Sequence, residues 1–430
     1  MADLQYSQDT WLGEVPAHWA VVPAKALFSN PVERNHSDDV HLTPSQKYGV
    51  LPQAEYMEIT GSRVVLNLSG ADNMRHVEPG DYISHLRSFQ GGLEYSPYKG
   101  KVSSAYTVLR PKQTIEPRYY KHLFKSSRYI QGLSTTTEQL RDGQSIRYEQ
   151  FALLPLPFPP VEDQKAIADF LDQRLGEIER LKDSQRRLET TLKARRKALI
   201  GHTVTKGLNP GVVRVETGYS WLGEVPEHWK LGTLKRFAEI GAGSGFPIEY
   251  QGVTDEEIPF LKVNSLSKAD STGLISSRED NVSRDTARQL GAKIYSAGSI
   301  VMAKIGAALL LGRVRTIEFD SCIDNNMMAI FPKPEVFPRF LYYLLQRIPF
   351  PLIVNPGAVP STSEGAVANL HMIMPPMSEQ VEIANFLDAE TRKIDQLMDR
   401  NSLMLQVLEE RKLALVAAAV TGKIDVRGQN

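Results

Sequence analysis

The sequence contains little cysteine, no net charge and no long hydrophobic run. Its 430 residues include one cysteine, Cys322, which excludes a disulfide framework and a thiolate-rich metal site. Because 50 Lys and Arg balance 50 Asp and Glu, any contact with nucleic acid must depend on local charge. The longest apolar stretches, such as 307–311 and 413–420, are far shorter than the roughly 20 residues of a membrane span. The polar N-terminal residues show no secretory signal, and we therefore expect a soluble, cytoplasmic protein.

An internal repeat organises the chain. Residues 11–19 read WLGEVPAHW and residues 221–229 read WLGEVPEHW, and these two copies contain all 4 tryptophans. An ungapped alignment of 159–208 with 375–424 gives 17 identities in 50 positions, where chance would give about three. The chain is therefore two copies of one unit of about 210 residues.

The middle of each copy, about 30–158 and 240–374, shows little identity but a common order. Both contain short β-branched runs separated by Gly, Ser and Pro turns, and both then have a helical stretch after a Pro-Arg pair, at 117–123 and 338–344. This order predicts one α/β fold that presents two different surfaces. The alternative is two diverged copies whose middles tolerated change.

Each copy ends in a long helical pattern without proline, from about 162 to 204 and from about 378 to 421. Each helix would extend on the order of 60–65 Å. The heptad a positions are Leu171, Ile178, Gln185, Leu192 and Leu199 in the first helix, and Leu387, Ile394, Asn401, Leu408 and Leu415 in the second. The d positions are Arg174, Leu181, Leu188 and Arg195, and then Glu390, Leu397, Met404 and Arg411.

This register predicts an antiparallel pair within one chain, with a polar amide at the same a position in both helices. The alternatives are helices packed on their own domains, or a dimerisation coil between chains. The boundaries predict a globular domain over 1–160, a helical region over 161–207, a second globular domain over 208–376 and a helical region over 377–430.

Catalytic motifs are weak. Residues 239–245 (EIGAGSG) resemble the glycine loop of adenosylmethionine-dependent methyltransferases, but charged residues precede them and Phe246-Pro247 would stop the helix that should follow. The chain has no phosphate-binding GxxxxGK[ST] loop, and Glu410 and Lys412, a nuclease-like pair, lie on the second long helix. The nine histidines show no HxxxH or HExxH spacing. We expect no catalytic residue and no metal site.

Local charge indicates DNA contact. Residues 82–130 hold nine Lys and Arg against two Glu, and Arg, Gln and Lys are the side chains that pair with base edges and phosphates. Solvated loops, and a solvated face for the basic run 186–197, are the alternatives. The candidate DNA-binding residues are Arg63, Arg87, Ser88, Gln90, Tyr95, Tyr98, Lys99 and Lys101 in the first copy, and Lys262, Asn264, Lys304, Arg313 and Arg315 in the second.

The whole chain resembles the specificity (S) subunit of type I restriction–modification systems, an HsdS-like protein. The resemblance rests on the doubled WLGEVPxHW, on the doubled helix openers PPVEDQKAIADFLD and PPMSEQVEIANFLD, and on the two long helices. It implies an α/β (α+β) tandem duplication with pseudo-two-fold symmetry, in which two target recognition domains are separated by two long antiparallel coiled-coil helices.

The resemblance also implies a function. Each target recognition domain would read one half of a split, asymmetric DNA site, with the halves about one helical turn apart. The helices would hold two methyltransferase (M) subunits, and motor/nuclease (R) subunits would join for cleavage. Adenosylmethionine, ATP and Mg are expected in these partners and not in this chain, which is then not an enzyme. The alternatives are a stand-alone DNA methyltransferase and a protein-binding structural adaptor.

Overall fold

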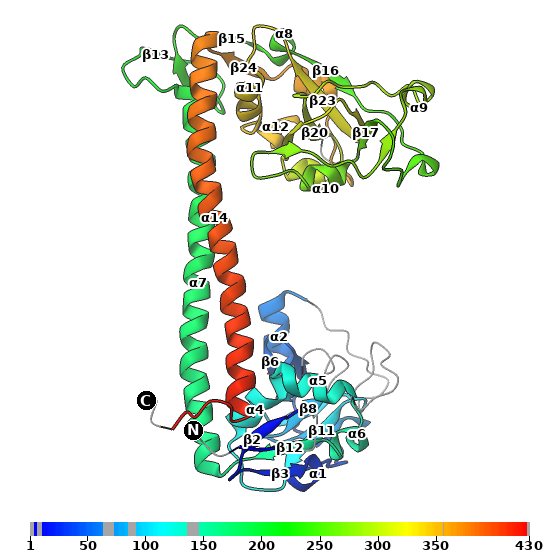
Figure 1. Cartoon of the computed structure of the whole chain (residues 1–430), viewed down its shortest axis with the longest axis vertical. Coiled ribbons are helices and arrows are strands. Elements are labelled where there is room, and N and C mark those ends of the chain that lie inside the picture. The colour runs from blue at the N-terminus through cyan, green and yellow to red at the C-terminus, as the bar shows by residue number, and fades with distance from the viewer. Residues whose placement is uncertain are drawn as a thin grey trace. The chain divides into compact units, whose positions relative to one another are not determined.

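The protein consists of two compact units, each made of one globular lobe and parts of two long helices (Figure 1). The computed structural model describes residues 4–6, 11–62, 73–84, 92–135, 146–355 and 357–427. Unit 1 comprises residues 1–185 and 403–430, and unit 2 comprises residues 186–402. Among the described residues, none of the helices combines the length and the apolar character that crossing a bilayer requires.

The lobe of unit 1 is built around an antiparallel four-stranded sheet with the order β4-β11-β8-β9. Short two-stranded sheets surround it, and one of them pairs β3 with β12. The strands are β1 (Leu4–Tyr6), β2 (Glu14–Pro16), β3 (Ala20–Pro23), β4 (Phe28–Ser29), β5 (Leu42–Ser45), β6 (Gly49–Pro52), β7 (Arg75–Val77), β8 (Tyr82–Ser84), β9 (Glu94–Tyr95), β10 (Gly100–Val102), β11 (Thr107–Pro111) and β12 (Pro155–Phe158). The helices are α1 (Ala24–Leu27), α2 (Gln53–Thr60), α4 (Pro117–Lys125), α5 (Ser127–Thr135) and α6 (Tyr148–Ala152).

The core of this lobe is aromatic. The ring of Phe28 lies 5.3–5.6 Å from the rings of Tyr82, Tyr120 and Phe124, and all four side chains are buried. Helix α4 presents Tyr120 and Phe124 on one face because these residues are four apart. Pro117 suits the first turn of α4, where its missing N–H leaves no helical acceptor unsatisfied.

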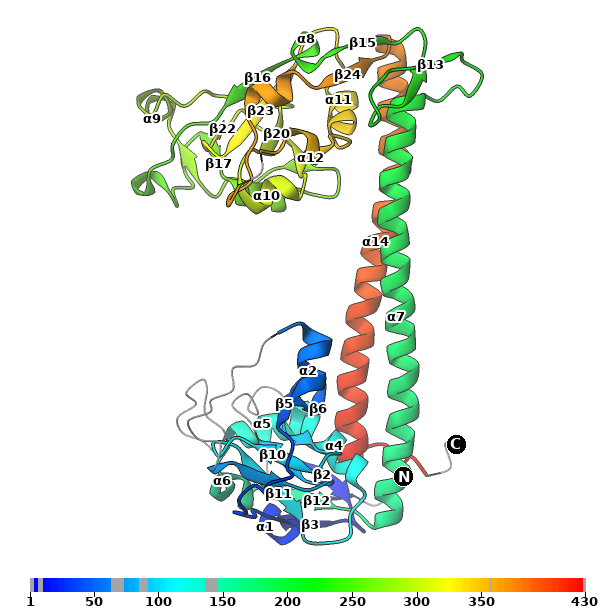
Figure 2. The same ribbon diagram turned by 180° about the vertical axis from the view of Figure 1, so that it is seen from behind.

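The lobe of unit 2 is seen from behind in Figure 2. It has a larger sheet, with the order β16-β23-β20-β21-β18, and a second sheet with the order β19-β17-β22. Its strands are β13 (Arg214–Glu216), β14 (Glu224–Pro226), β15 (Lys230–Thr233), β16 (Ala238–Ala242), β17 (Ile258–Leu261), β18 (Leu274–Ile275), β19 (Asn281–Val282), β20 (Ile300–Ala303), β21 (Val314–Ile317), β22 (Cys322–Ile323), β23 (Met327–Pro332) and β24 (His371–Met374). Its helices are α8 (Leu234–Phe237), η2 (Ile248–Tyr250), η3 (Val263–Ser267), α9 (Arg284–Gln289), α10 (Gly306–Leu310), α11 (Pro338–Leu345), α12 (Phe350–Ile353) and α13 (Glu364–Ala368).

The two lobes share a frame, as the repeat predicts. The pairing of β3 with β12 matches that of β15 with β24, and the row β4-β11-β8 matches β16-β23-β20. Helix α4 matches α11, and both begin at the proline of a Pro-Arg pair. The next strand of each row also matches, since β9 pairs antiparallel with β8 as β21 does with β20, whereas the parallel pairings of β17 with β22 and of β18 with β21 occur in unit 2 alone among the described strands. The expected α/β tandem duplication is therefore confirmed.

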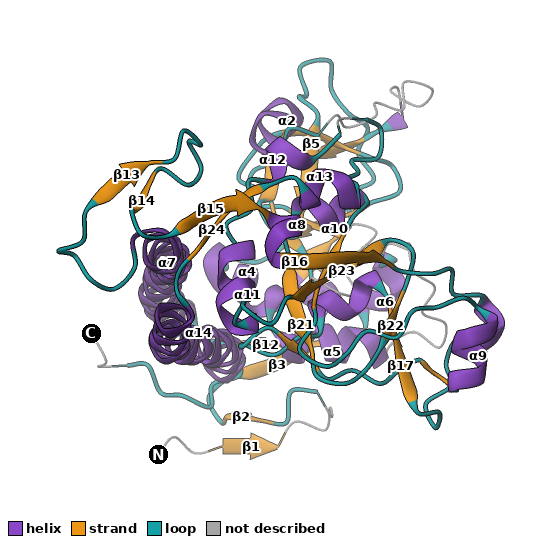
Figure 3. Ribbon diagram, turned by 90° about the horizontal axis from the view of Figure 1, so that it is seen from above, coloured by secondary structure: helices purple, strands orange, loops and turns teal. Residues whose placement is uncertain are grey.

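The long helices are α7 (Val161–Lys206) and α14 (Met377–Val420), close to the predicted boundaries. Each unit by itself contains an antiparallel pair of helix segments, which lie side by side in Figure 3. In unit 1 the pairs Glu179–Lys412 and Lys182–Glu409 show that a step forward along α7 is a step back along α14. In unit 2 Arg196 pairs with Asp395, 2.8 Å away, in the same register.

The face that joins these segments differs from the predicted seam. At the a positions Leu171, Ile178, Leu192, Leu387, Ile394, Asn401 and Leu408 are buried, while Gln185, Leu199 and Leu415 are half-buried. The apolar d positions are instead exposed: Leu181 (51%), Leu188 (45%), Leu397 (49%) and Met404 (48%). The e positions lie beside the a positions, and there Lys182, Arg196 and Lys412 form ion pairs with the opposite helix. An a/e seam thus replaces the a/d seam, because charged e residues pair across it.

Candidate nucleic-acid interface

The doubled motif anchors each lobe to the first turn of its own long helix. In unit 1 Asp163 Oδ2 accepts hydrogen bonds from Trp19 Nε1 (3.1 Å) and lies 2.7 Å from His18 Nε2. In unit 2 Glu379 accepts from Trp229 Nε1 (3.0 Å) and lies 2.6 Å from His228 Nε2. The acids occupy matching positions, and a carboxylate in the first turn also suits the helix dipole. We call these two sets of contacts the anchors.

Further matched contacts hold the short helices of the lobes. The buried side chain of Gln164 donates to Pro159 O (2.8 Å) and accepts from the Glu116 backbone N–H (2.8 Å), just before α4. Gln380 makes the same two bonds to Pro375 O (2.9 Å) and from Phe337 N–H (2.7 Å), just before α11. The repeated PPxxxQ therefore positions one short helix against one long helix in each unit.

The Arg of each Pro-Arg pair then binds a long-helix aspartate. Arg118 pairs with Asp172 (3.0 Å) and Arg339 pairs with Asp388 (2.6 Å). Burial raises the pKa of Asp172, but hydrogen bonds from His122 and Arg118 outweigh burial and hold that pKa below its usual value. Asp172 is therefore a stable anionic partner for Arg118.

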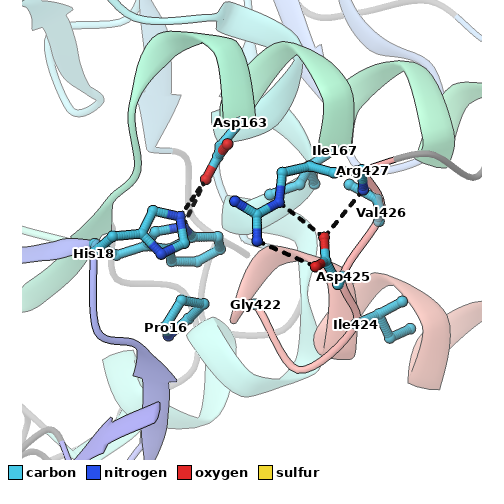
Figure 4. A pocket seen from close by; sticks show the side chains of 10 residues that line it. Pro16, His18, Asp163, Ile167, Gly422, Ile424, Asp425, Val426 and Arg427 are labelled. Atoms are coloured by element: carbon cyan, nitrogen blue, oxygen red, sulfur yellow. Dashed lines mark hydrogen bonds and ion pairs between the residues drawn. The ribbon is translucent and has the colours of Figure 1, made fainter. Parts of the chain in front are cut away.

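The anchor of unit 1 also contacts the end of the other long helix (Figure 4). Gly422, which follows α14, lies against the anchor, and a Cβ on it would come 2.3 Å from Pro16 Cδ. Beyond it Val426 is buried, and Arg427 pairs with Asp425 at 2.9 Å. In unit 2 Gly207 follows α7 in the same way, with its Cβ position 3.2 Å from Trp229. Each unit thus holds the start of one long helix and the end of the other.

Sequence reasoning missed these anchors as a site. His18, Asp163, His228 and Glu379 carry no catalytic spacing, and the pairs are about 145 and 151 residues apart. The repeat itself offered one signal. An acid recurs at the same position of both helix openers, and the dipeptide His-Trp recurs at the end of both WLGEVPxHW motifs.

The candidate DNA-binding residues of the first lobe fall into two groups. Arg63, Arg87, Ser88 and Gln90 lie outside the described residues. Tyr95 packs against the aromatic core, 5.5 Å from Tyr82, and burial raises its pKa. Tyr98 packs on the small cluster around Val102. Lys99 is exposed and pairs with Asp38 at 3.1 Å, and Lys101 lies on β10.

In the second lobe most of the candidate cations have partners within the chain. Lys262 pairs with Asp280 (2.7 Å), and Lys304 pairs with Glu364 (2.8 Å). Arg315 donates to Leu266 O (3.0 Å) and to Val314 O (2.8 Å), and burial lowers its pKa. Asn264 is exposed and Arg313 is half-exposed. These residues remain candidates.

The basic excess of 82–130 is compensated in space by acids from elsewhere in the chain. Arg110 pairs with Asp81 (2.8 Å) and Glu33 (3.2 Å), and Lys99 pairs with Asp38 (3.1 Å). Local sequence charge therefore overestimates the positive charge that this lobe offers to a phosphate.

The glycine loop at 239–245 has a structural explanation. Gly241 faces Tyr295, where a Cβ would come 2.5 Å from the hydroxyl, and Gly243 faces Asp324, where a Cβ would come 1.9 Å from the carbonyl oxygen. Residues 239–242 lie in the strand β16, and a 3-10 turn, η2, follows the loop. Close backbone packing thus accounts for both glycines.

Comparison with known proteins identifies the family. The model of the type I restriction modification DNA specificity domain matches residues 33–190 and 226–403. The chain belongs to this family. The two matches coincide with the two copies of the repeat, so this specificity subunit carries two DNA specificity domains and is not itself an enzyme.

Several relatives are similar over most of the chain. The putative type I restriction enzyme MjaX specificity subunit of Methanocaldococcus jannaschii is 24% identical, over 97% of this chain and 96% of the relative. The StySPI specificity subunit of Salmonella potsdam is 23% identical over 73% of this chain and 68% of its own length.

Solved structures show the same fold. A chain from a study of complex assembly and conformational transition of the type I R-M system aligns with a TM-score of 0.74, at 14% identity, over 95% of this chain and 99% of that one. The HsdS subunit from Thermoanaerobacter tengcongensis aligns with a TM-score of 0.54, at 15% identity, over 95% and 98% of the two chains.

Proposed function

We propose that the two lobes read the two unlike halves of one bipartite DNA sequence. The observation that carries this proposal is that both units repeat the same anchors while their outer sheets differ. Contacts retained in both copies serve assembly, and the elements that differ are free to serve recognition. Among the described candidates, Lys101 belongs to β10, which lies outside the row of strands that the two lobes share.

The antiparallel helices would set the distance between the half-sites. Two lobes held at a fixed spacing can contact DNA only at two patches, so the halves would be separated by about one turn, centre to centre. The chain carries no net charge. Its own DNA affinity would then be low and would rise on assembly, with a steeper salt dependence for the complex than for the free chain.

The exposed d positions are the surface we assign to methyltransferase (M) subunits. Leu181 and Met404 belong to unit 1, and their repeat-related counterparts Leu397 and Leu188 belong to unit 2, so the two units offer equivalent pairs of apolar side chains. Apolar side chains gathered on a helix surface are typical of a protein interface. Two equivalent surfaces would hold two M subunits, and R subunits would join them. Adenosylmethionine, ATP and Mg would be bound by those partners, in the cytoplasm.

Methylation mapping of the whole genome tests the reading function. We expect a strain that carries the gene and its M partner to methylate adenines in a bipartite asymmetric motif that is lost on deletion of the gene. An unchanged methylome would favour the adaptor alternative. Methylation of DNA by the purified chain with labelled adenosylmethionine would favour the stand-alone methyltransferase.

A paired deletion tests the spacing role. Removing one heptad from each helix, 185–191 and 401–407, keeps the a register and shortens both helices equally. The methylated motif should then change its spacer length or disappear. The same motif with the same spacer would contradict the proposal.

Variants of the d positions test the partner surface. Leu181→Asp with Leu397→Asp should abolish or strongly weaken co-purification of the M subunit. The matched control is Leu153→Asp with Leu352→Asp, since these leucines are also exposed (70% and 68%) but lie in the lobes. Equal loss in both pairs of variants would contradict the assignment.

A further inference from the structure

A buried histidine in the first lobe lies between two carboxylates. The side chain of His76, on β7, is fully buried. Its Nδ1 is 2.7 Å from Asp39 Oδ2, and its Nε2 is 2.7 Å from Glu78 Oε1. The ring of His36 stacks on it with a centroid distance of 4.1 Å. Neither histidine takes part in the anchors or in the predicted DNA surface.

Several acidic side chains surround these two rings. Three carboxylates, those of Glu33, Asp39 and Glu78, face the two imidazoles. Arg110 is the guanidinium that reaches this region, and it is shared between Glu33 and Asp81. The neighbouring Lys99 is exposed and pairs with Asp38.

Asp39 is the buried member of this acidic group. Its side chain is buried, and its Oδ1 has no hydrogen-bond partner among the described residues. Its Oδ2 accepts from the His36 backbone N–H (2.7 Å) and lies within hydrogen-bond distance of His76 Nδ1. Burying a carboxylate is unfavourable unless a positive charge is close.

The donor atoms are arranged as ligands. Glu33, His36 and His76 each offer one ligand atom, and these atoms all lie within 4.8 Å of one another. His36 Nε2 and Glu33 Oε1 are 3.2 Å apart. Imidazole nitrogen together with carboxylate oxygen is a donor set that Zn²⁺ prefers in proteins.

The Asp39 contact completes the pattern. A metal-binding histidine usually donates its second ring N–H to a carboxylate, which fixes the tautomer and turns the other nitrogen toward the ion. Asp39 at Nδ1 of His76 would do this and leave Nε2 for the metal. We propose that Glu33, His36 and His76 bind one Zn²⁺, with Glu78 able to provide a further oxygen.

Bound zinc would join two separate segments of the lobe. Glu33, His36 and Asp39 come from the segment between β4 and β5, whereas His76 and Glu78 come from β7 and the residue after it. Among the described residues, groups with this ligand spacing occur only in this region of unit 1. Zinc would therefore stabilise unit 1 selectively, and this inference does not depend on the DNA-reading proposal.

Zinc titration of the chelator-treated full chain tests the site. We expect calorimetry to give one Zn²⁺ per chain, and hydrogen exchange in peptides covering 33–39 and 73–78 to slow on zinc addition. His36→Ala and Glu33→Gln should each weaken zinc binding at least about 10-fold, and Asp39→Asn should weaken it by about 10- to 100-fold. His202→Ala, which removes an exposed histidine from α7, is the matched control and should bind as the parent chain does.

His36 is the key position because its side chain is 46% exposed, so its loss should not unfold the lobe. The competing occupant is a proton shared between His76 and its carboxylates. In that case the parent chain takes up no zinc, or the His36→Ala chain binds zinc as tightly as the parent, and either result overturns the proposal. Protection by zinc of peptides outside this region would also overturn it.

Discussion

The two units agree where they hold the helices and differ where they face outward. Asp163 and Glu379, Gln164 and Gln380, and Asp172 and Asp388 are repeat-related pairs that make the same contacts. By contrast, the three-stranded sheet β19-β17-β22 of unit 2 has no counterpart of the same order in the described part of unit 1. Duplication has thus preserved the connection between lobe and helix while the exposed sheets diverged.

Small differences inside the anchors show how much change this connection tolerates. Asp163 uses a single oxygen for both the histidine and the tryptophan, whereas the longer Glu379 uses one oxygen for each. Trp11 is buried and packs edge-on against Tyr129, whereas its counterpart Trp221 is only partly buried. The contact is retained although the side chains that make it have shifted.

The largest effect is expected when buried side chains at a positions are truncated. This change tests whether the a positions stabilise both units equally. Leu171→Ala and Leu387→Ala remove repeat-related side chains that are fully buried. Each should lower the free energy of unfolding of its own unit by about 2–5 kcal/mol. Native-state hydrogen exchange of lobe and helix peptides would report the two units separately.

The d positions provide the matched control for that comparison. Leu181→Ala and Leu397→Ala truncate exposed leucines on the same helices. They should change the free energy of unfolding by less than about 0.5 kcal/mol. A cost equal to that of the a positions would mean that the seam is a/d after all.

An intermediate effect is expected at the anchors. Asp163→Ala removes the charged acceptor of the Trp19 N–H, and Glu379→Ala removes that of the Trp229 N–H. The two tryptophans are 4% and 6% exposed. Each should cost about 1.5–3 kcal/mol in its own unit, because hydrogen bonds to charged groups contribute this much. Local hydrogen exchange at 11–19 and 221–229 would measure the cost.

Glu162→Ala and Glu382→Ala are suitable controls for the anchors, since both residues are exposed acids near the starts of the same helices. They alter charge near the helix dipole without touching the anchor. If they destabilise the units as much as the anchor variants do, the dipole and not the hydrogen bonds explains the effect.

Sequence alone was sufficient for the architecture. The repeat and the proline-free helical patterns predicted two α/β lobes and two long helices. They could do so because contacts that both copies retain require the same residues in both copies. The predicted seam was wrong at d because the d row is apolar at Leu181, Leu188 and Leu397, whereas the e row, which lies in the seam, holds charged residues such as Lys182 and Arg196. Hydrophobic patterning reports which residues avoid water but not whether a helix within the chain or another protein covers them.

The DNA surface was the least predictable part. Net charge over a window ignores acids brought close by folding, and Arg110 shows this, since it pairs with Asp81 and Glu33 at 29 and 77 residues' separation. The sequence analysis did not predict the cluster of Glu33, His36 and His76 for the same reason. Its histidines are 40 positions apart and follow no motif spacing.

The smallest effect on stability is expected when an ion pair between the two long helices, which is present in both units, is removed. Glu179–Lys412 in unit 1 corresponds to Asp395–Arg196 in unit 2. Hydrogen bonding to Lys412 holds the pKa of Glu179 below its usual value despite partial burial. The folded state therefore favours the carboxylate, so the pair stabilises unit 1 near neutral pH, and this contribution is lost as the pH falls through the lowered pKa.

Glu179→Gln should therefore cost unit 1 about 0.2–1 kcal/mol at neutral pH, as is typical of partly exposed ion pairs, and almost nothing below the lowered pKa. Hydrogen exchange of peptides from 171–185 in parent and variant, compared at neutral and acid pH, would measure the difference. Glu410→Gln removes an exposed acid from the same pair of helices and controls for the general effect of charge. A difference between Glu179→Gln and the parent that persists unchanged into acid would show that Glu179 contributes packing and not charge.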